Sequence, residues 1–96
     1  MTTTKIQVKI SIEKPTAQRL KDLNVTTWPL WTKEPSTFDW HYDESETCYF
    51  LEGEVTVNTK GGSFSFGKGD LVVLPQGLSC TWHVKKAVRK HYRFGQ

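Results

Sequence analysis

Short runs in which apolar and polar residues alternate, separated by glycine and proline, dominate this 96-residue chain. The clearest are residues 38–42 and 80–84, where every second side chain is apolar or aromatic. This period of two is typical of a strand with one buried face, because successive side chains point to opposite sides of a sheet. Gly61 and Gly62 predict a tight hairpin between two such runs. The pattern predicts an all-β chain, folded as a sandwich or barrel of many short strands.

Shorter runs between turn residues predict the remaining strands. They cover residues 5–14, 47–51, 55–58, 63–66, 71–74 and 87–94. Gly53 is expected to turn the chain between the second and third of these. Residues 28–31 are apolar, but Pro29 restricts them to an edge or irregular strand, because proline has no N–H for a central ladder.

One short helix is expected near the N-terminus. Pro15 ends the first strand and suits the first turn of a helix. Ala17, Leu20 and Leu23 follow at helical spacing within residues 16–23, and Asn24 suits a left-handed helix end. The chain has no linker, repeat or low-complexity segment, so residues 1–96 are predicted to form a single domain.

The composition argues against several classes of protein. Apolar residues make up 36% of the chain, and no apolar run approaches the roughly 18 residues of a membrane span. Without the apolar block of a signal peptide, the chain is expected to be intracellular and by default cytoplasmic, with Cys48 and Cys80 as free thiols. The net charge of +3 is small and the charges are interspersed, so neither nucleic acid nor a membrane is expected as a partner.

Basic residues gather near the C-terminus. They are Lys85, Lys86, Arg89, Lys90 and Arg93. We interpret them as solvent-exposed side chains of an edge strand, where positive charge discourages pairing with other chains. Contact with an anion is the alternative interpretation.

Two of the predicted strands indicate an interior pocket. If Glu46 points inward, Cys48 and Phe50 do so as well, and if Cys80 points inward, Trp82 follows. Each strand then offers a polar group or a thiol near one end and apolar side chains deeper down. This is the profile of a ligand pocket, and Phe50, Cys80 and Trp82 are the predicted ligand contacts.

The run 38–42 allows two registers. One places Phe38, Trp40 and Tyr42 in the interior, and the other places Asp39 and His41 there. Alternation alone favours aromatic side chains inside, because three large rings facing water would be costly.

Residues 39–53 resemble the first motif of the cupin family. In most cupins this motif reads His-x-His, three or four residues, Glu, six residues and Gly. Here Asp39-Trp40-His41 stands in the place of His-x-His, and Glu46 and Gly53 follow at the same spacing. Glu46 is thus the motif glutamate, while Asp39 replaces a histidine.

Residues 69–80 resemble the second cupin motif, which reads Gly, five residues, Pro-x-Gly, two residues and His. The chain has Gly69, Pro75, Gly77 and then Cys80 in the place of the histidine. The resemblance implies a small jelly-roll-like β-barrel of two antiparallel sheets.

The resemblance also implies that the motif residues face the pocket. We therefore expect Asp39 and His41 to point inward. The aromatic residues of the same strand would then point outward, covered by the N-terminal segment or by a second copy of the chain.

A metal site at the four motif positions is a further implication of the resemblance. Its ligands would be Asp39, His41, Glu46 and Cys80. Nitrogen, oxygen and sulfur donors suit a divalent ion such as zinc, manganese, iron or nickel. A pocket without metal is the alternative, with His41 in a hydrogen bond and Cys80 as a small buried apolar group.

Longer phrases, among them ETCYFLEG and GDLVVLPQGLSCTW, are similar to short single-domain proteins grouped with the ureidoglycine aminohydrolase-type cupins. Many of these proteins are of unknown function. The enzyme for which the group is named is a manganese-dependent hydrolase with two cupin domains. This chain has one cupin domain, and His41 alone matches the expected histidine positions.

Three functions are predicted as alternatives. The first is a small cupin that binds a small polar molecule in the barrel pocket. The second is a metal-dependent enzyme acting on a small nitrogen-containing or carboxylate substrate, with Glu46 or His41 moving the proton. The third is a structural or interaction protein that dimerises through the aromatic face of residues 38–42.

Overall fold

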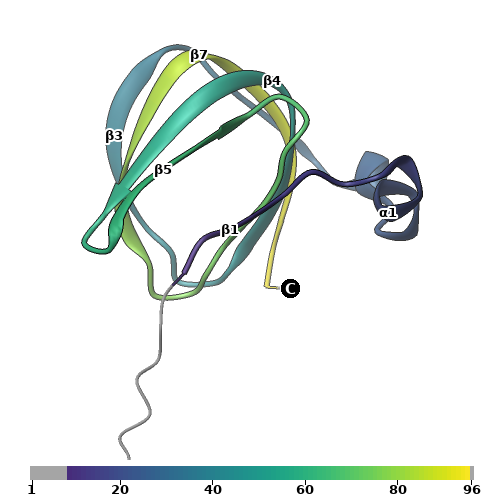
Figure 1. Ribbon diagram of the computed structural model, residues 1–96, viewed down its shortest axis with the longest axis horizontal. Coiled ribbons are helices and arrows are strands. Elements are labelled where there is room, and N and C mark those ends of the chain that lie inside the picture. The colour runs from purple at the N-terminus through teal and green to yellow at the C-terminus, as the bar shows by residue number, and fades with distance from the viewer. Residues whose placement is uncertain (1–8, 96) are drawn as a thin grey trace, which may run out of the picture.

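The strands curl around a common interior in the computed structural model, which describes residues 9–95 (Figure 1). They are β1 (Ser11–Glu13), β2 (Leu30–Lys33), β3 (Ser36–His41), β4 (Glu46–Thr59), β5 (Gly62–Gly67), β6 (Leu71–Leu74) and β7 (Ser79–Phe94). All pairings are antiparallel, in the order β1-β6-β4-β7-β2, with β3 added to β7 and β5 to β4. The all-β prediction is confirmed.

The two longest strands, β4 and β7, change partners along their length. The start of β4 pairs with β6 and with the end of β7, whereas its second half pairs with β5 and with the start of β7. Register shifts separate the two parts, between Phe50 and Val55. In this way one pair of bent strands contributes to most of the barrel wall.

Gly53 lies at this bend, with φ of +112°. A Cβ atom there would lie 2.8 Å from the carbonyl oxygen of Ala87 and 2.8 Å from Cα of Val88. Glycine is required because it tolerates both the positive φ and the close approach. The separation of residues 47–51 from 55–58 is therefore wrong, since Gly53 bends one strand instead of turning between two. Residues 80–84 and 87–94 likewise belong to one strand, β7.

The short helix α1 (Ala17–Asp22) lies to one side of the barrel (Figure 1). The side chain of Thr16 caps it by accepting a hydrogen bond from the N–H of Arg19 at 3.1 Å. Asn24 follows in the left-handed conformation, with φ of 54°, and leads into the 3₁₀ helix η1 (Val25–Thr27). The predicted helix is thus confirmed. Of the first predicted strand, residues 5–8 lie outside the described residues.

The barrel interior is packed with side chains from the inner faces of the strands. They include Tyr42, Cys48, Phe50, Val55, Val57, Phe66, Val72, Leu74, Trp82 and Val88. A smaller cluster of Val25, Trp28 and Leu71 attaches the segment after α1 to the barrel. Burial of these apolar side chains is the main stabilising contribution to such a fold.

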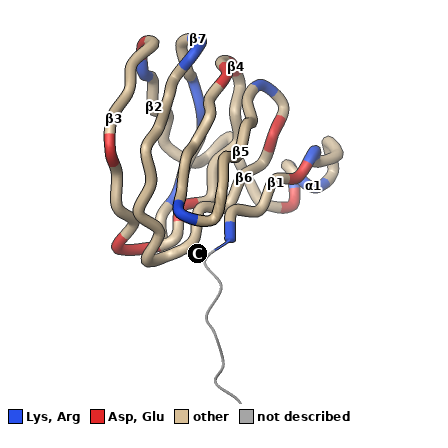
Figure 2. The backbone as a smooth tube through the Cα atoms, turned by 60° about the vertical axis from the view of Figure 1, so that its left-hand side comes forward, with Lys and Arg blue, Asp and Glu red and all other residues tan. Residues whose placement is uncertain are grey.

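Strand β7 has neighbours on both sides, with β4 on one and β2 and β3 on the other. The interpretation of its basic residues as part of an edge strand is therefore wrong. Lys90 is also buried, whereas Lys85, Lys86, Arg89 and Arg93 are exposed. Elsewhere, acidic and basic residues are interspersed along the tube in Figure 2.

Within residues 9–95, the structure has no helix with the length and apolar character needed to cross a membrane.

Candidate functional site

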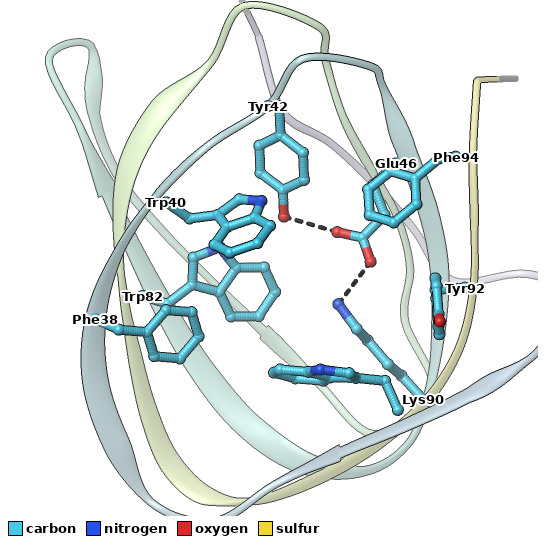
Figure 3. Close-up of a pocket in the computed structure, with 9 residues that line it drawn as sticks. Phe38, Trp40, Tyr42, Glu46, Trp82, Lys90, Tyr92 and Phe94 are labelled. Atoms are coloured by element: carbon cyan, nitrogen blue, oxygen red, sulfur yellow. Dashed lines mark hydrogen bonds and ion pairs between the residues drawn. The ribbon is translucent and has the colours of Figure 1, made fainter.

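An aromatic cavity of about 280 Å³ opens from the barrel interior (Figure 3). Seven aromatic side chains and two charged ones line it. They are Trp31, Phe38, Trp40, Tyr42, Trp82, Tyr92 and Phe94, together with Glu46 and Lys90. The cavity is thus largely apolar, with a single pair of opposite charges.

Glu46 and Lys90 form a buried ion pair in this cavity. The Lys90 ammonium donates a hydrogen bond to Oε2 of Glu46 at 2.8 Å, and the Tyr42 hydroxyl donates to Oε1 at 2.7 Å (Figure 3). Each of the two charged residues is only 3% exposed. Both carboxylate oxygens therefore have a donor, as a buried charge requires.

The pairing of β4 with β7 explains why these two side chains meet. Glu46 lies opposite Phe94, and Phe50 lies opposite Lys90, four residues along each strand. Residues an even number apart on a strand share a face, so all four side chains point inward. The long side chains of Glu46 and Lys90 then span the distance between their positions.

Aromatic rings surround the Lys90 ammonium. Its nitrogen lies 4.6 Å from the ring centroid of Trp82, 4.7 Å from that of Trp31 and 5.6 Å from that of Phe50. Such contacts stabilise a cation through the negative face of the ring, and more strongly when water is excluded. Lys90 is thus held by one carboxylate and by a cage of rings.

Tyr42 keeps its proton in this environment. Burial raises the pKa of its hydroxyl, and the neighbouring Glu46 raises it further. A phenol with a raised pKa remains a hydrogen-bond donor at all physiological pH values. Tyr42 therefore fixes the orientation of the Glu46 carboxylate.

The register of β3 is opposite to the expected one. Phe38 lies opposite Trp82, and Trp40 lies opposite Cys80, so these side chains share the inner face. Phe38, Trp40 and Tyr42 line the cavity, although Trp40 is 49% exposed at its mouth. The prediction that Asp39 and His41 point into the pocket is therefore wrong.

Asp39 and His41 instead lie on the outer face of the barrel and are exposed. Asp39 accepts a hydrogen bond from the Thr81 hydroxyl at 2.7 Å, and Nδ1 of His41 lies 2.7 Å from the Ser79 hydroxyl. The physical reason is the one that alternation alone indicated, because the aromatic side chains gain more by facing the interior.

Cys80 is buried beside the cavity, in the main core. Its thiol donates a weak hydrogen bond to the carbonyl of Trp40 at 3.7 Å. Burial raises the pKa of Cys80, and the nearby indole N–H of Trp82 opposes that rise only partly. This N–H has no hydrogen-bond partner among the described residues, and sulfur is in general only a weak acceptor. Burial therefore favours the neutral thiol of Cys80 over the thiolate.

The donors do not fit the predicted metal site. Within residues 9–95, no three side chains of His, Cys, Asp or Glu lie where they could share a metal ion. Of the four expected ligands, only Glu46 lines the cavity, and its oxygens are engaged by Tyr42 and Lys90. The ammonium beside it would also repel a divalent cation.

The other predicted site residues lie partly in the cavity and partly outside it. Trp82 lines the cavity, while Phe50 is fully buried in the core, with its ring centroid 5.6 Å from the Lys90 nitrogen. His41 lies outside the cavity, where it cannot take the predicted role in proton transfer. A catalytic role for Glu46 stays a prediction.

Lys90 is the charged cavity residue that sequence reasoning missed. It alternates with Val88, Tyr92 and Phe94, which are apolar or aromatic, while Arg89 and Arg93 belong to the opposite face. That alternation was the available signal, and grouping all basic residues of the segment together obscured it.

Comparison with known proteins identifies the family to which this sequence is similar. The model of the EutQ-like cupin domain matches residues 20–92 of the chain. Among curated proteins, none matches the chain.

The chain is similar to several solved structures. A crystal structure of a DUF861 family protein from Thermotoga maritima is 54% identical, with a TM-score of 0.87 over 90% of this chain and 99% of that one. A putative ethanolamine utilization protein Q from Salmonella typhimurium is 26% identical, with a TM-score of 0.63 over 69% of this chain and 54% of that one. The EutQ protein of Clostridium difficile, at 24% identity and a TM-score of 0.63, shares the fold over 69% of this chain and 52% of its own.

Proposed function

This chain belongs to the family of EutQ-like cupin domains, and we propose that it binds a small, flat organic molecule in the aromatic cavity. The ligand's polar group would contact the Glu46–Lys90 ion pair, and its apolar body would pack between the rings. One observation carries this proposal: a fully buried ion pair set in the wall of an otherwise aromatic cavity.

A buried ion pair is a poor device for stability alone. Removing two charges from water costs several kcal/mol per ion, and apolar residues of similar volume are often equally good or better. The pair therefore has a stronger rationale as a recognition element. Inside an apolar cavity it offers both a donor and an acceptor to a ligand, with little competition from water.

The size and walls of the cavity limit the ligand. At about 280 Å³ it lies near the lower end of small-molecule pockets, which run from roughly 300 to 1,000 Å³. That volume suits a molecule of about one ring. Aromatic walls favour a flat partner, because rings stack on or pack edge-to-face against other rings.

Trp40 and Phe94 support an entry route. They line the cavity and are 49% and 46% exposed, which is unusual for large apolar side chains. Exposed aromatic residues around a hollow are typical of a ligand entrance.

The metal-dependent alternative, of the ureidoglycine aminohydrolase type, has less support. Its expected ligands are divided between the two faces of the barrel wall, and the cavity already contains a cation in Lys90. The dimer alternative relied on aromatic side chains of residues 38–42 facing outward, and these side chains face the cavity. Along the described part of the chain, acidic and basic residues alternate without a basic cluster on one side, which supports a small molecule over nucleic acid as the partner (Figure 2).

Tryptophan fluorescence provides the test, because Trp31, Trp40 and Trp82 all line the cavity. We expect a panel of single-ring compounds, including benzyl alcohol, benzamide and benzoate, to contain members that quench the fluorescence in a saturable manner. Phe38→Ala should weaken binding, because Phe38 stacks on Trp82 with their centroids 6.1 Å apart.

Thr37→Ala is the matched control, since Thr37 is the exposed neighbour of Phe38 on the opposite face of β3. Equal binding by both variants, or no saturable quenching across the panel, would contradict the proposal.

A further inference from the structure

We propose that Lys90 forms a covalent imine with an aldehyde or ketone bound in the cavity, and that Glu46 carries the protons for this reaction. The inference rests on the proposed function, because the carbonyl compound must first occupy the aromatic cavity. It adds a reaction class and names the bond that forms, between Nζ of Lys90 and the carbonyl carbon.

The position of the amine is the first argument. Lys90 is the one amine among the residues that line the cavity, and its nitrogen is turned toward the cavity interior in Figure 3. The exposed lysines of the same strand, such as Lys85 and Lys86, point into solvent instead. A ligand in the cavity therefore meets a single amine.

The surroundings of the amine are the second argument. A lysine amine attacks a carbonyl only when it is neutral, and an adjacent general base supplies that state by taking its proton. Lys90 is 3% exposed and is enclosed by Trp31, Trp82 and Phe50. Its single hydrogen-bond partner among the described side chains is the Glu46 carboxylate.

Glu46 is placed to take and return protons. The Lys90 ammonium passes one proton along the 2.8 Å hydrogen bond to Oε2 of Glu46, which leaves a neutral amine and a carboxylic acid. The nitrogen lone pair attacks the carbonyl carbon, the C=O π electrons move to oxygen, and Glu46 returns its proton to that oxygen. The product of this step is a carbinolamine protonated on nitrogen, and Glu46 is again a carboxylate.

Loss of water completes the reaction. The carbinolamine nitrogen gives a second proton to Glu46, and Glu46 passes it to the hydroxyl, which leaves as water when the C–O bond breaks. The nitrogen lone pair forms the C=N bond. In sum, one ammonium and one carbonyl give one protonated imine and one water, with no change in charge.

The site suits this product as well as the starting state. The protonated imine has the same positive charge as the ammonium and lies at the same place, beside Glu46 and between the Trp31 and Trp82 rings. Tyr42 holds the other carboxylate oxygen throughout, through its 2.7 Å hydrogen bond. The site is therefore organised for the cation that the reaction forms.

Reductive trapping tests the inference. The full chain is incubated with benzaldehyde, a single-ring aldehyde, and borohydride then supplies hydride that converts any imine to a stable secondary amine. We expect one adduct per chain, located on Lys90 by peptide mapping. Benzyl alcohol, which has the same ring and no carbonyl, should compete with the labelling without forming an adduct.

Three variants sharpen the test. Lys90→Arg keeps a positive charge beside Glu46 and should lose the adduct, whereas Lys86→Arg, at an exposed position on the same strand, should keep it. Glu46→Gln retains an acceptor for Tyr42 but can neither take nor return a proton, so it should slow labelling of Lys90 relative to the unchanged protein. Peptide mapping of the unchanged protein needs no variant, so a folding defect in Lys90→Arg does not remove the test.

The outcomes separate the inference from the proposed function. Binding of both compounds without an adduct on Lys90, or an adduct spread over the exposed lysines, would overturn the imine and leave the binding site in place. Absence of binding by both compounds and of an adduct would overturn both.

Discussion

The inner and outer faces of β3 and β7 differ in side-chain type, burial and contacts, although their residues are neighbours along the chain. On the inner face, Phe38 lies opposite Trp82 and packs as part of the cavity wall. One residue further, on the outer face, Asp39 lies opposite Thr81 and shares a hydrogen bond with it in solvent. The outer face carries hydrogen-bonded polar pairs of the residue types common in active sites, whereas the inner face lines an aromatic cavity with one ion pair.

This difference shows that residue type is a poor guide to a site when the register is undetermined. The outer pairs, Asp39 with Thr81 and His41 with Ser79, are exposed hydrogen bonds of the kind that contribute little. The inner pair of Glu46 and Lys90 has the same chemistry of donor and acceptor, but burial makes each partner depend on the other.

The largest expected effect is on the inner ion pair. Glu46→Ala leaves the Lys90 charge buried without its partner, so we expect a loss of about 3–5 kcal/mol in the free energy of unfolding. The exposed carboxylate variant Asp39→Ala is the control and should cost at most about 1 kcal/mol. Urea denaturation measures both.

A double variant separates the cost of an orphaned charge from the cost of lost packing. Glu46→Gln combined with Lys90→Met removes both charges and keeps an acceptor for Tyr42, so most of the lost stability should return. A loss in Glu46→Ala no larger than in Asp39→Ala would show that the inner pair is as well hydrated as the outer one.

Phe38 and Thr37 provide the next comparison, since they are neighbours on opposite faces of β3. Phe38→Ala should lower the free energy of unfolding by about 2 kcal/mol, less than the roughly 3–5 kcal/mol of a fully buried phenylalanine, because Phe38 is only half-buried. Thr37→Ala should change it by about 0.5 kcal/mol or less. Thermal and urea denaturation measure both variants. A Thr37→Ala variant less stable than Phe38→Ala would contradict the assignment of the inner and outer faces.

Alkaline pH should lower the free energy of unfolding through a buried thiol in the barrel interior. Burial raises the pKa of the Cys48 thiol from 9.0 to about 12. The unfolded chain therefore releases this proton first, so the stabilisation is complete below about pH 9 and is lost as the pH rises toward 12. The slope for this proton is about 1.4 kcal/mol per pH unit.

Denaturation as a function of pH checks this dependence, and Cys48→Ala is its control. The variant is expected to be less stable at neutral pH but to lose less stability as the pH rises. Burial raises the pKa of Tyr42 as well, so some alkaline loss should remain in the variant. The same slope in both proteins would exclude Cys48 as a cause.

The smallest expected effect is that of His41→Ala. Its imidazole is exposed and its contact with Ser79 is a surface hydrogen bond, so stability should change by about 0.5 kcal/mol or less. Saturable quenching by single-ring compounds should also be unchanged, because His41 lies outside the cavity. A weaker ligand affinity in this variant would return His41 to the functional site.

Much of the fold was predictable because it depends on local chemistry. Thr16 and Asn24 mark the ends of the helical segment through a cap and a left-handed residue, both of which are properties of the residues themselves. Residues 71–74 were predicted as a strand and form β6. By contrast, Gly53 looked like a turn because a glycine has the same local preference in a turn and in a bulge.

The candidate site was only partly predictable. The inward direction of Glu46 was expected from the motif resemblance and that of Trp82 from its alternation with Cys80, and both residues line the cavity. The wrong face of β3 was predicted to point inward, because the spacing similar to a cupin motif was given more weight than the cost of exposing three aromatic rings. Lys90 was overlooked because its charge suggested solvent, although its strand neighbours suggested the interior.

By itself, the sequence determined that this chain consists of short β-strands with one short helix, since alternation and turn residues act over a few positions, while the resemblance to cupins indicated the barrel. The tertiary structure alone decided which acid meets which base, because Glu46 and Lys90 are 44 residues apart and meet only when β4 and β7 pair. The physical reason is that burial of a charge is tolerable only with a partner, and strand pairing supplies that partner from a distant part of the chain.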